Sequence, residues 1–101
     1  MNTTVKNLFE QFCKAYNLRT RQDVTLRADN PQQKDYYSND FVKMDYNPSY
    51  GGYRIDVVQT GTGERFFDRM SRMSSKEMIA YLRGMLSAKN KWCFNEIVKE
   101  S

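Results

Sequence analysis

The chain has 101 residues, which predicts one domain (residues 1–101), and 14% of them are aromatic, which excludes a disordered chain. No apolar run approaches the roughly 18 residues of a membrane span, and the N-terminus lacks the basic and apolar regions of a signal peptide. We therefore expect a cytoplasmic protein with no membrane partner. The net charge is +4, and residues 64–91 hold seven basic and three acidic side chains, so the excess is concentrated in one segment.

The composition also argues against an enzyme. Without histidine, neither a Ser-His nor a Cys-His pair can form, and the stretch around Gly61 and Gly63 lacks the lysine of a phosphate-binding loop and is typical of a turn. The seven aspartates are scattered, and two distant cysteines cannot hold a metal without further ligands. We expect no catalysis, no metal and no cofactor. Cys13 and Cys93 lie at apolar positions of helical patterns, which favours buried thiols over a disulfide between them.

Residues 4–17 are predicted to form an amphipathic helix, capped by Thr3 or Thr4 and ended at Asn17. Residues 23–29 alternate, with Val24 facing the same way as Leu26 and Ala28, which predicts a half-buried strand that ends at Asn30-Pro31. Residues 30–40 are then expected to form the longest loop.

Residues 41–46 and 53–59 are predicted as two further strands, followed by a turn at 60–63 and a short returning strand at 65–67. The apolar side chains expected on one face are Val42, Met44, Tyr46, Tyr53, Ile55 and Val57. The side chains expected on the opposite, solvated face are Thr25, Arg27, Lys43, Asp45, Arg54 and Asp56. Val58 interrupts this polar face, so we expect part of it to be covered.

Ser74 and Glu77 have the spacing of a capping box, and Met73 and Met78 occupy the positions of a hydrophobic staple, so a helix is expected to begin here. Gly84 inside this helix suggests the close approach of another backbone. Residues 91–100 are expected to be helical as well. The whole order predicts an α+β fold, a three- to four-stranded antiparallel meander with the N-terminal and C-terminal helices packed on one face.

Binding is better supported than catalysis, and two groups of residues are candidates. The basic group can hold phosphate or carboxylate, and the loop tyrosines can stack on bases or anchor a protein interface. The candidates are Arg65, Arg69, Arg72, Lys76 and Arg83 with Tyr36, Tyr37 and Tyr50. The alternative for the arginines is a solvated or ion-paired surface. The alternative for Tyr36 and Tyr37 is that they fold back onto the domain.

Two function classes follow from these groups. The first is an accessory or protein-interaction module, which uses a sheet edge or loop tyrosines to bind an unknown protein partner or a second copy of itself. The second is a nucleic-acid-binding protein that uses the basic patch in residues 65–91.

Residues 50–55 (YGGYRI) and 75–85 (SKEMIAYLRGM) resemble stretches of small uncharacterised proteins encoded by phages and mobile elements of gut bacteria. The resemblance covers about residues 50–86. It implies a small accessory protein in an intracellular setting, and it implies a role for no individual residue.

Overall fold

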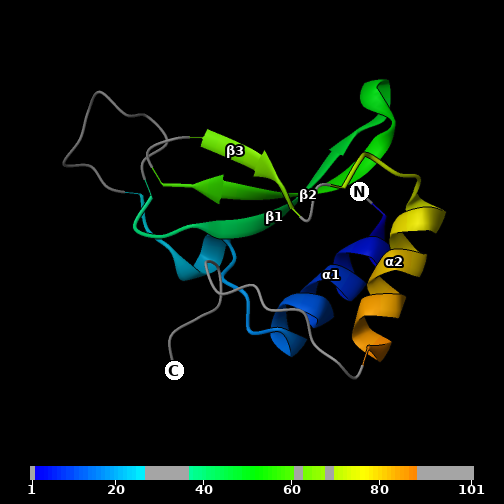
Figure 1. The fold of residues 1–101 in the computed structure, drawn as a ribbon, viewed down its shortest axis with the longest axis horizontal. Helices are drawn as coiled ribbons and strands as arrows, with labels where there is room; N and C mark the ends of the chain where they lie inside the picture. Colours follow the sequence, from blue (N-terminus) through cyan, green and yellow to red (C-terminus); the bar gives the residue numbers. More distant parts are fainter. Residues whose placement is uncertain (1, 27–36, 61–62, 68–69, 89–101) are drawn as a thin grey trace.

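A computed structural model describes residues 2–26, 37–60, 63–67 and 70–88, apart from the side chains of residues 63–66. Within these residues, two helices pack together beside antiparallel strands, so the α+β prediction is confirmed (Figure 1). The predictions made for Tyr36, Arg69, Cys93 and the helix at 91–100 lie outside the described residues.

The strands form a hairpin with a third strand beside it. Strands β1 (Phe41–Asn47) and β2 (Gly52–Gln59) pair antiparallel, with Val42 opposite Val57, and β3 (Gly63–Phe66) pairs antiparallel with the other side of β2. The sheet order is therefore β1-β2-β3. As the alternation predicts, the side chains of Tyr53, Ile55 and Val57 are buried.

The first predicted strand is wrong for the part of it that is described. Residues Arg21–Asp23 form a short 3₁₀-helix, η1, in which the Asp23 carboxylate accepts a hydrogen bond from the Thr20 N–H at 2.8 Å. This local side-chain bond gives the backbone an alternative to a strand ladder. Leu26 is 51% exposed, whereas Val24 packs with Phe41 and Val58. The Val58 side of the sheet is thus partly covered, as predicted.

The two helices begin at side-chain caps. Helix α1 (Thr3–Ala15) is capped by Asn2, not by Thr3 or Thr4, because the Asn2 Oδ1 accepts the N–H of Thr4 at 2.8 Å. Helix α2 (Ser75–Ser87) has the predicted capping box: the Glu77 N–H donates to Ser74 Oγ at 3.1 Å, and the Ser74 N–H donates to the Glu77 carboxylate at 3.0 Å.

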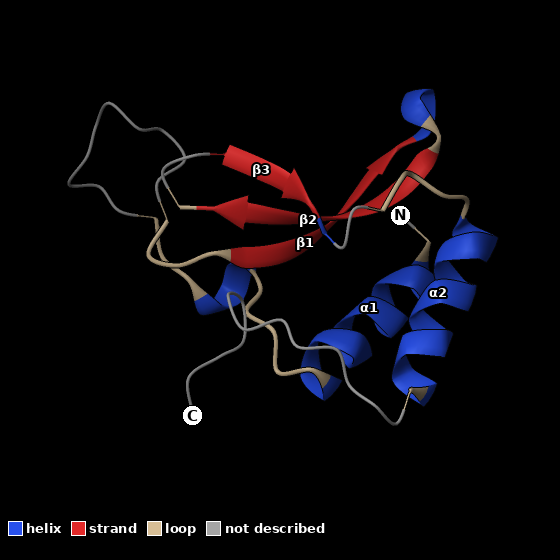
Figure 2. Ribbon diagram, in the orientation of Figure 1, coloured by secondary structure: helices blue, strands red, loops and turns tan. Residues whose placement is uncertain are grey.

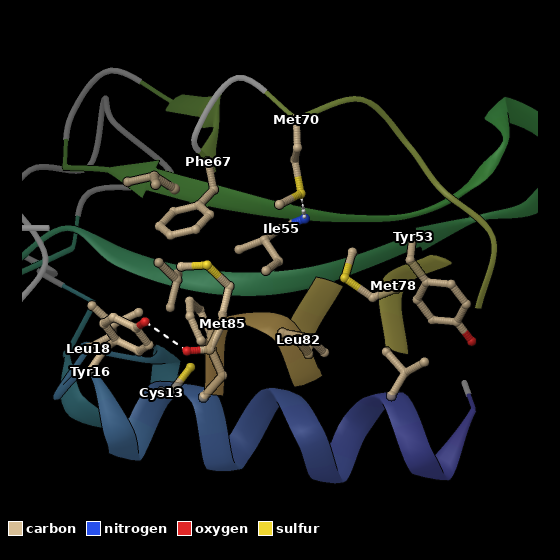
Figure 3. Close-up of a cluster of buried hydrophobic side chains, with 14 residues drawn as sticks. Cys13, Tyr16, Leu18, Tyr53, Ile55, Phe67, Met70, Met78, Leu82 and Met85 are labelled. Carbon is tan, nitrogen blue, oxygen red and sulfur yellow. Dashed lines mark hydrogen bonds between the residues drawn. The ribbon is translucent and has the colours of Figure 1, made fainter. Parts of the chain in front are cut away.

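Both helices lie on the same side of the strands (Figure 2). They share one apolar cluster with the inward face of the strands. At its centre Phe12, from α1, is fully buried and meets the ring of Phe67 edge-on, with centroids 6.0 Å apart. The Tyr16 hydroxyl donates to the Met85 carbonyl at 2.8 Å, which satisfies a carbonyl in the last turn of α2 (Figure 3). The predicted burial of the Cys13 thiol is confirmed.

Two expectations about individual residues are wrong. Asp56, predicted on a solvated face, is only 1% exposed, and its buried carboxylate accepts hydrogen bonds from the guanidinium of Arg54, two residues earlier in β2. Gly84 does not mark a close approach of another described segment, because a Cβ built there would meet none of its atoms within 4 Å.

Replacing Gly84 with Ala should therefore raise the free energy of unfolding by about 0.5–1 kcal/mol, since alanine is the better helix former and space is available. Urea denaturation of the two proteins measures this difference. A destabilised variant would show that the glycine is needed for packing.

The Ser74 N–H and hydroxyl, which hydrogen-bond Glu77, lower the pKa of its carboxyl below the ordinary 4.5. The pKa of Glu77 is lower in the folded state than in the unfolded state. The cap therefore contributes its full stability at pH values above the unfolded-state pKa, and this contribution is lost as the pH falls through the folded-state pKa. The stability difference between the native protein and Glu77→Gln, whose amide does not titrate, should therefore diverge from its neutral value only below about pH 4.5. Denaturation at a series of pH values measures it; a difference that does not vary with pH contradicts the cap.

Candidate functional site

Strand β2 has backbone partners on both of its sides. One side faces β1, and the other faces β3 through Val57 and Gln59. Further along that second side, the Ile55 N–H donates to the Met70 sulfur at 3.2 Å (Figure 3). Tyr53 and Met73 then exchange two backbone hydrogen bonds of 2.8 Å. The second side of β2 is thus covered over most of its length.

Strand β1 differs, because the described residues cover its outer edge at one end only. The Val42 N–H donates to the Arg19 carbonyl at 2.9 Å, away from β2. Since backbone groups alternate sides along a strand, the N–H and C=O groups of Met44 and Tyr46 face outward too. No backbone hydrogen bond reaches them from the described part of the chain. The edge stops at Pro48, which has no N–H to offer.

A groove of about 530 Å³ runs beside this edge, between β1, α1 and η1. Its apolar floor includes Phe9 and Met44, which are half-buried against the main cluster. Its rim is charged. The ionisable side chains that line it, apart from the buried Cys13 thiol, are Lys6, Glu10, Lys14, Arg21, Asp23 and Lys43.

Some of these rim side chains already make hydrogen bonds within the protein, and others do not make an ion pair with any described residue. Asp23 accepts the Thr20 N–H and hydroxyl, and Arg21 donates to the Val24 carbonyl at 3.1 Å. Lys6 and Lys14 are exposed, and neither makes an ion pair with another described residue. These two ammonium groups are therefore the ones that a ligand in the groove can meet at low desolvation cost.

Of the predicted basic residues, Arg72 has a structural role. Its guanidinium pairs with the Asp45 carboxylate and donates to the Gly52 carbonyl at 2.9 Å, so it fastens the segment before α2 to the hairpin. The predicted alternative, an ion-paired surface, is thus realised at Arg72. Gly52 itself has φ +114°, and a Cβ there would lie 2.5 Å from the Met73 carbonyl oxygen. Only glycine lets these two segments approach so closely.

The remaining predicted cations do not gather around Arg72 in the part of the chain that is described. Lys76 and Arg83 are exposed on α2, seven residues apart and so on the same side of the helix. Arg65 lies in β3, and its side chain, like the whole of Arg69, is outside the described residues.

The two described tyrosines among the candidates differ in their exposure. Tyr37 folds back onto the domain: its ring meets Phe41 edge-on at 5.0 Å, and the Arg21 guanidinium lies 5.0 Å from its centroid. Tyr50 is 76% exposed in the 3₁₀-helix η2 (Pro48–Tyr50) at the hairpin tip, where it lines a hollow with Arg54 and Arg72. Both of those arginines are already paired with aspartates.

The β1 edge and its groove were missed as a residue set by the sequence analysis. Lys6 and Lys14 belong to the amphipathic helix predicted at residues 4–17, and nothing in the sequence places their side of that helix beside β1. The one available signal was Pro48, since proline directly after a strand is typical of an edge.

No group of three metal-ligating side chains occurs within residues 2–26, 37–60, 63–67 and 70–88. Neither of the two long helices in these ranges has the length and apolar character needed to cross a bilayer.

Arg72→Ala should lower the free energy of unfolding by about 1–3 kcal/mol, because it leaves the Asp45 carboxylate and the Gly52 carbonyl without this donor. Lys76→Ala and Arg83→Ala, which remove exposed cations, should change it by no more than about 0.5 kcal/mol. Thermal or urea denaturation compares the three variants. Equal effects would show that Arg72 is a surface cation like the others.

Comparisons of the chain with protein-family models, with curated proteins and with solved structures found no match. The likeness of residues 50–86 to small phage and mobile-element proteins therefore stays a prediction.

Proposed function

We propose that the chain is a non-catalytic protein-interaction module, which binds an extended segment of a partner protein along the outer edge of β1. The observation that carries the proposal is the outward backbone groups of Met44 and Tyr46, for which no described residue provides a partner. An unpaired strand edge is a template for main-chain hydrogen bonds with another chain.

The side chains around this edge also favour the binding of an extended peptide segment. The Tyr46 ring, 46% exposed, lies against Tyr53 with centroids 4.6 Å apart, so an aromatic surface is held in place where a partner strand would run. The groove offers Phe9 and Met44 to side chains on the helix-facing side of that strand. Backbone pairing supplies affinity in such a complex, and the groove supplies selectivity.

Nucleic-acid binding through residues 65–91 is the alternative. It relies on the seven basic side chains of this segment, of which Arg72 already holds Asp45 and the Gly52 carbonyl. Lys76 and Arg83 remain exposed on α2. The described residues therefore favour a protein partner over nucleic acid.

Two neighbouring proline substitutions should have opposite effects. Tyr46→Pro removes an N–H that faces outward, so β1 and β2 should stay paired, whereas Asp45→Pro removes an N–H that faces Arg54 in the ladder and should unfold the hairpin. Circular dichroism and thermal melting compare both with Tyr46→Ala, which shortens the same side chain but keeps the N–H.

Binding itself is measured with peptides selected from a displayed random library against the folded protein. Selected peptides should bind Tyr46→Pro at least about tenfold more weakly than Tyr46→Ala, since the partner loses a main-chain hydrogen bond and meets the proline ring. Peptides that bind Tyr46→Pro and Tyr46→Ala alike, while both variants remain folded, would refute the edge as the binding site.

A further inference from the structure

Resting on that proposed function, we propose that the β1 edge selects an acidic extended segment, in which two carboxylates flank one apolar residue on the side that faces α1. The apolar residue lies over Phe9 and Met44, and the carboxylates pair with Lys6 and Lys14. The pattern is acidic–x–apolar–x–acidic, because alternate residues of a strand share a face.

Helix α1 runs beside β1 in the opposite direction, and contacts at both ends show this. Near the start of α1, the Asn2 N–H donates to the Tyr53 hydroxyl at 2.9 Å, and Tyr53 is the partner of Tyr46 in the ladder. Just after α1, the Arg19 carbonyl accepts the N–H of Val42. Lys6 therefore lies toward the Tyr46 end of the edge and Lys14 toward the Val42 end.

The lengths of the edge and the helix agree. Lys6 and Lys14 are eight residues apart, which is about 12 Å along an α-helix. Residues i and i+4 of an added strand are about 13 Å apart. Glu10 lies between the two lysines on the same groove-lining stripe. A carboxylate at the central position would be repelled by Glu10, which is why we assign an apolar residue there.

A second copy of the chain fits the edge less well. The antiparallel register that satisfies both outward residues pairs Met44 of each copy with Tyr46 of the other, which sets the two Asp45 side chains directly opposite each other. Each of these carboxylates is already paired with its own Arg72, so the two would supply no attraction across the edge. A second copy would also bring its own groove rim, which has four basic and two acidic side chains, so two surfaces with an excess of positive charge would face each other.

The test uses three nine-residue peptides, whose cores are Glu-Thr-Leu-Thr-Glu, Lys-Thr-Leu-Thr-Lys and Leu-Thr-Glu-Thr-Leu. NMR titration of the ¹⁵N-labelled protein gives each dissociation constant from the amide shifts of Met44 and Tyr46. The first peptide should bind at least about fivefold more tightly than either of the others at low ionic strength. This preference should shrink when the ionic strength rises to about 1 M, where the screening length is about 3 Å.

The double variant Lys6→Glu/Lys14→Glu should abolish the preference for the acidic peptide. Its matched control is Lys76→Glu/Arg83→Glu, which changes the net charge equally on the exposed side of α2 and should keep the preference. If the control variant loses the preference instead, the assignment to the groove is wrong. It is also wrong if the protein binds an oligonucleotide more tightly than the acidic peptide and Lys6→Glu/Lys14→Glu leaves that binding unaffected. Tight self-association without any peptide would overturn it as well.

The inference and the proposed function can fail separately. If library-selected peptides need the Tyr46 N–H but show no preference for acidic residues, the acidic pattern is wrong and the docking edge stands. If no peptide of any charge shifts the Met44 and Tyr46 amides, both are wrong.

Discussion

The candidate site depends on one constraint, which is the direction in which the backbone N–H and C=O groups point along the β1–β2 hairpin. The N–H and C=O groups of every second residue of β1 point toward β2, and those of the intervening residues point away from it. On β2 the corresponding outward groups meet β3, the Met70 sulfur and the Met73 backbone. Among the outward backbone groups of β1, Val42 alone has a backbone partner in the described part of the chain, the Arg19 carbonyl. Among residues 2–26, 37–60, 63–67 and 70–88, the outer edge of β1 is therefore paired at its start and unpaired in its middle, and it ends at Pro48.

The apolar cluster gives this edge its chemistry. Phe12 and Leu82 are fully buried between the helices and the strands, so α1 is fixed beneath the sheet. A helix in that position brings an outer stripe, with Lys6, Glu10 and Lys14, next to β1. The charge on the groove is thus a consequence of helix packing. It lies apart from the basic segment that dominates the sequence, in which Arg72 stabilises the approach to α2.

The parts of the fold that depend on local patterns could be predicted from the sequence. The capping box at Ser74 and Glu77 and the alternation of β2 are properties of neighbouring residues, and both are found as expected. The strand predicted at 23–29 is not found over its described residues, 23–26, because the Thr20–Asp23 hydrogen bonds at its start compete with a ladder. Arg72 and Asp56 could not be assigned, because their roles depend on partners or burial that only the fold defines. The same holds for the edge: a strand's free side depends on the order of strands in the sheet.

Residue-resolved hydrogen exchange of the unliganded protein tests the central claim most directly. The amides of Lys43 and Asp45 face β2 and the Val42 amide faces Arg19, so all three should be protected, while those of Met44 and Tyr46 between them should exchange nearly as fast as in an unfolded chain. Such an alternating pattern is what an open β1 edge requires. Slow exchange at Met44 and Tyr46, equal to that of their neighbours, would show that the edge is already occupied and would contradict the account.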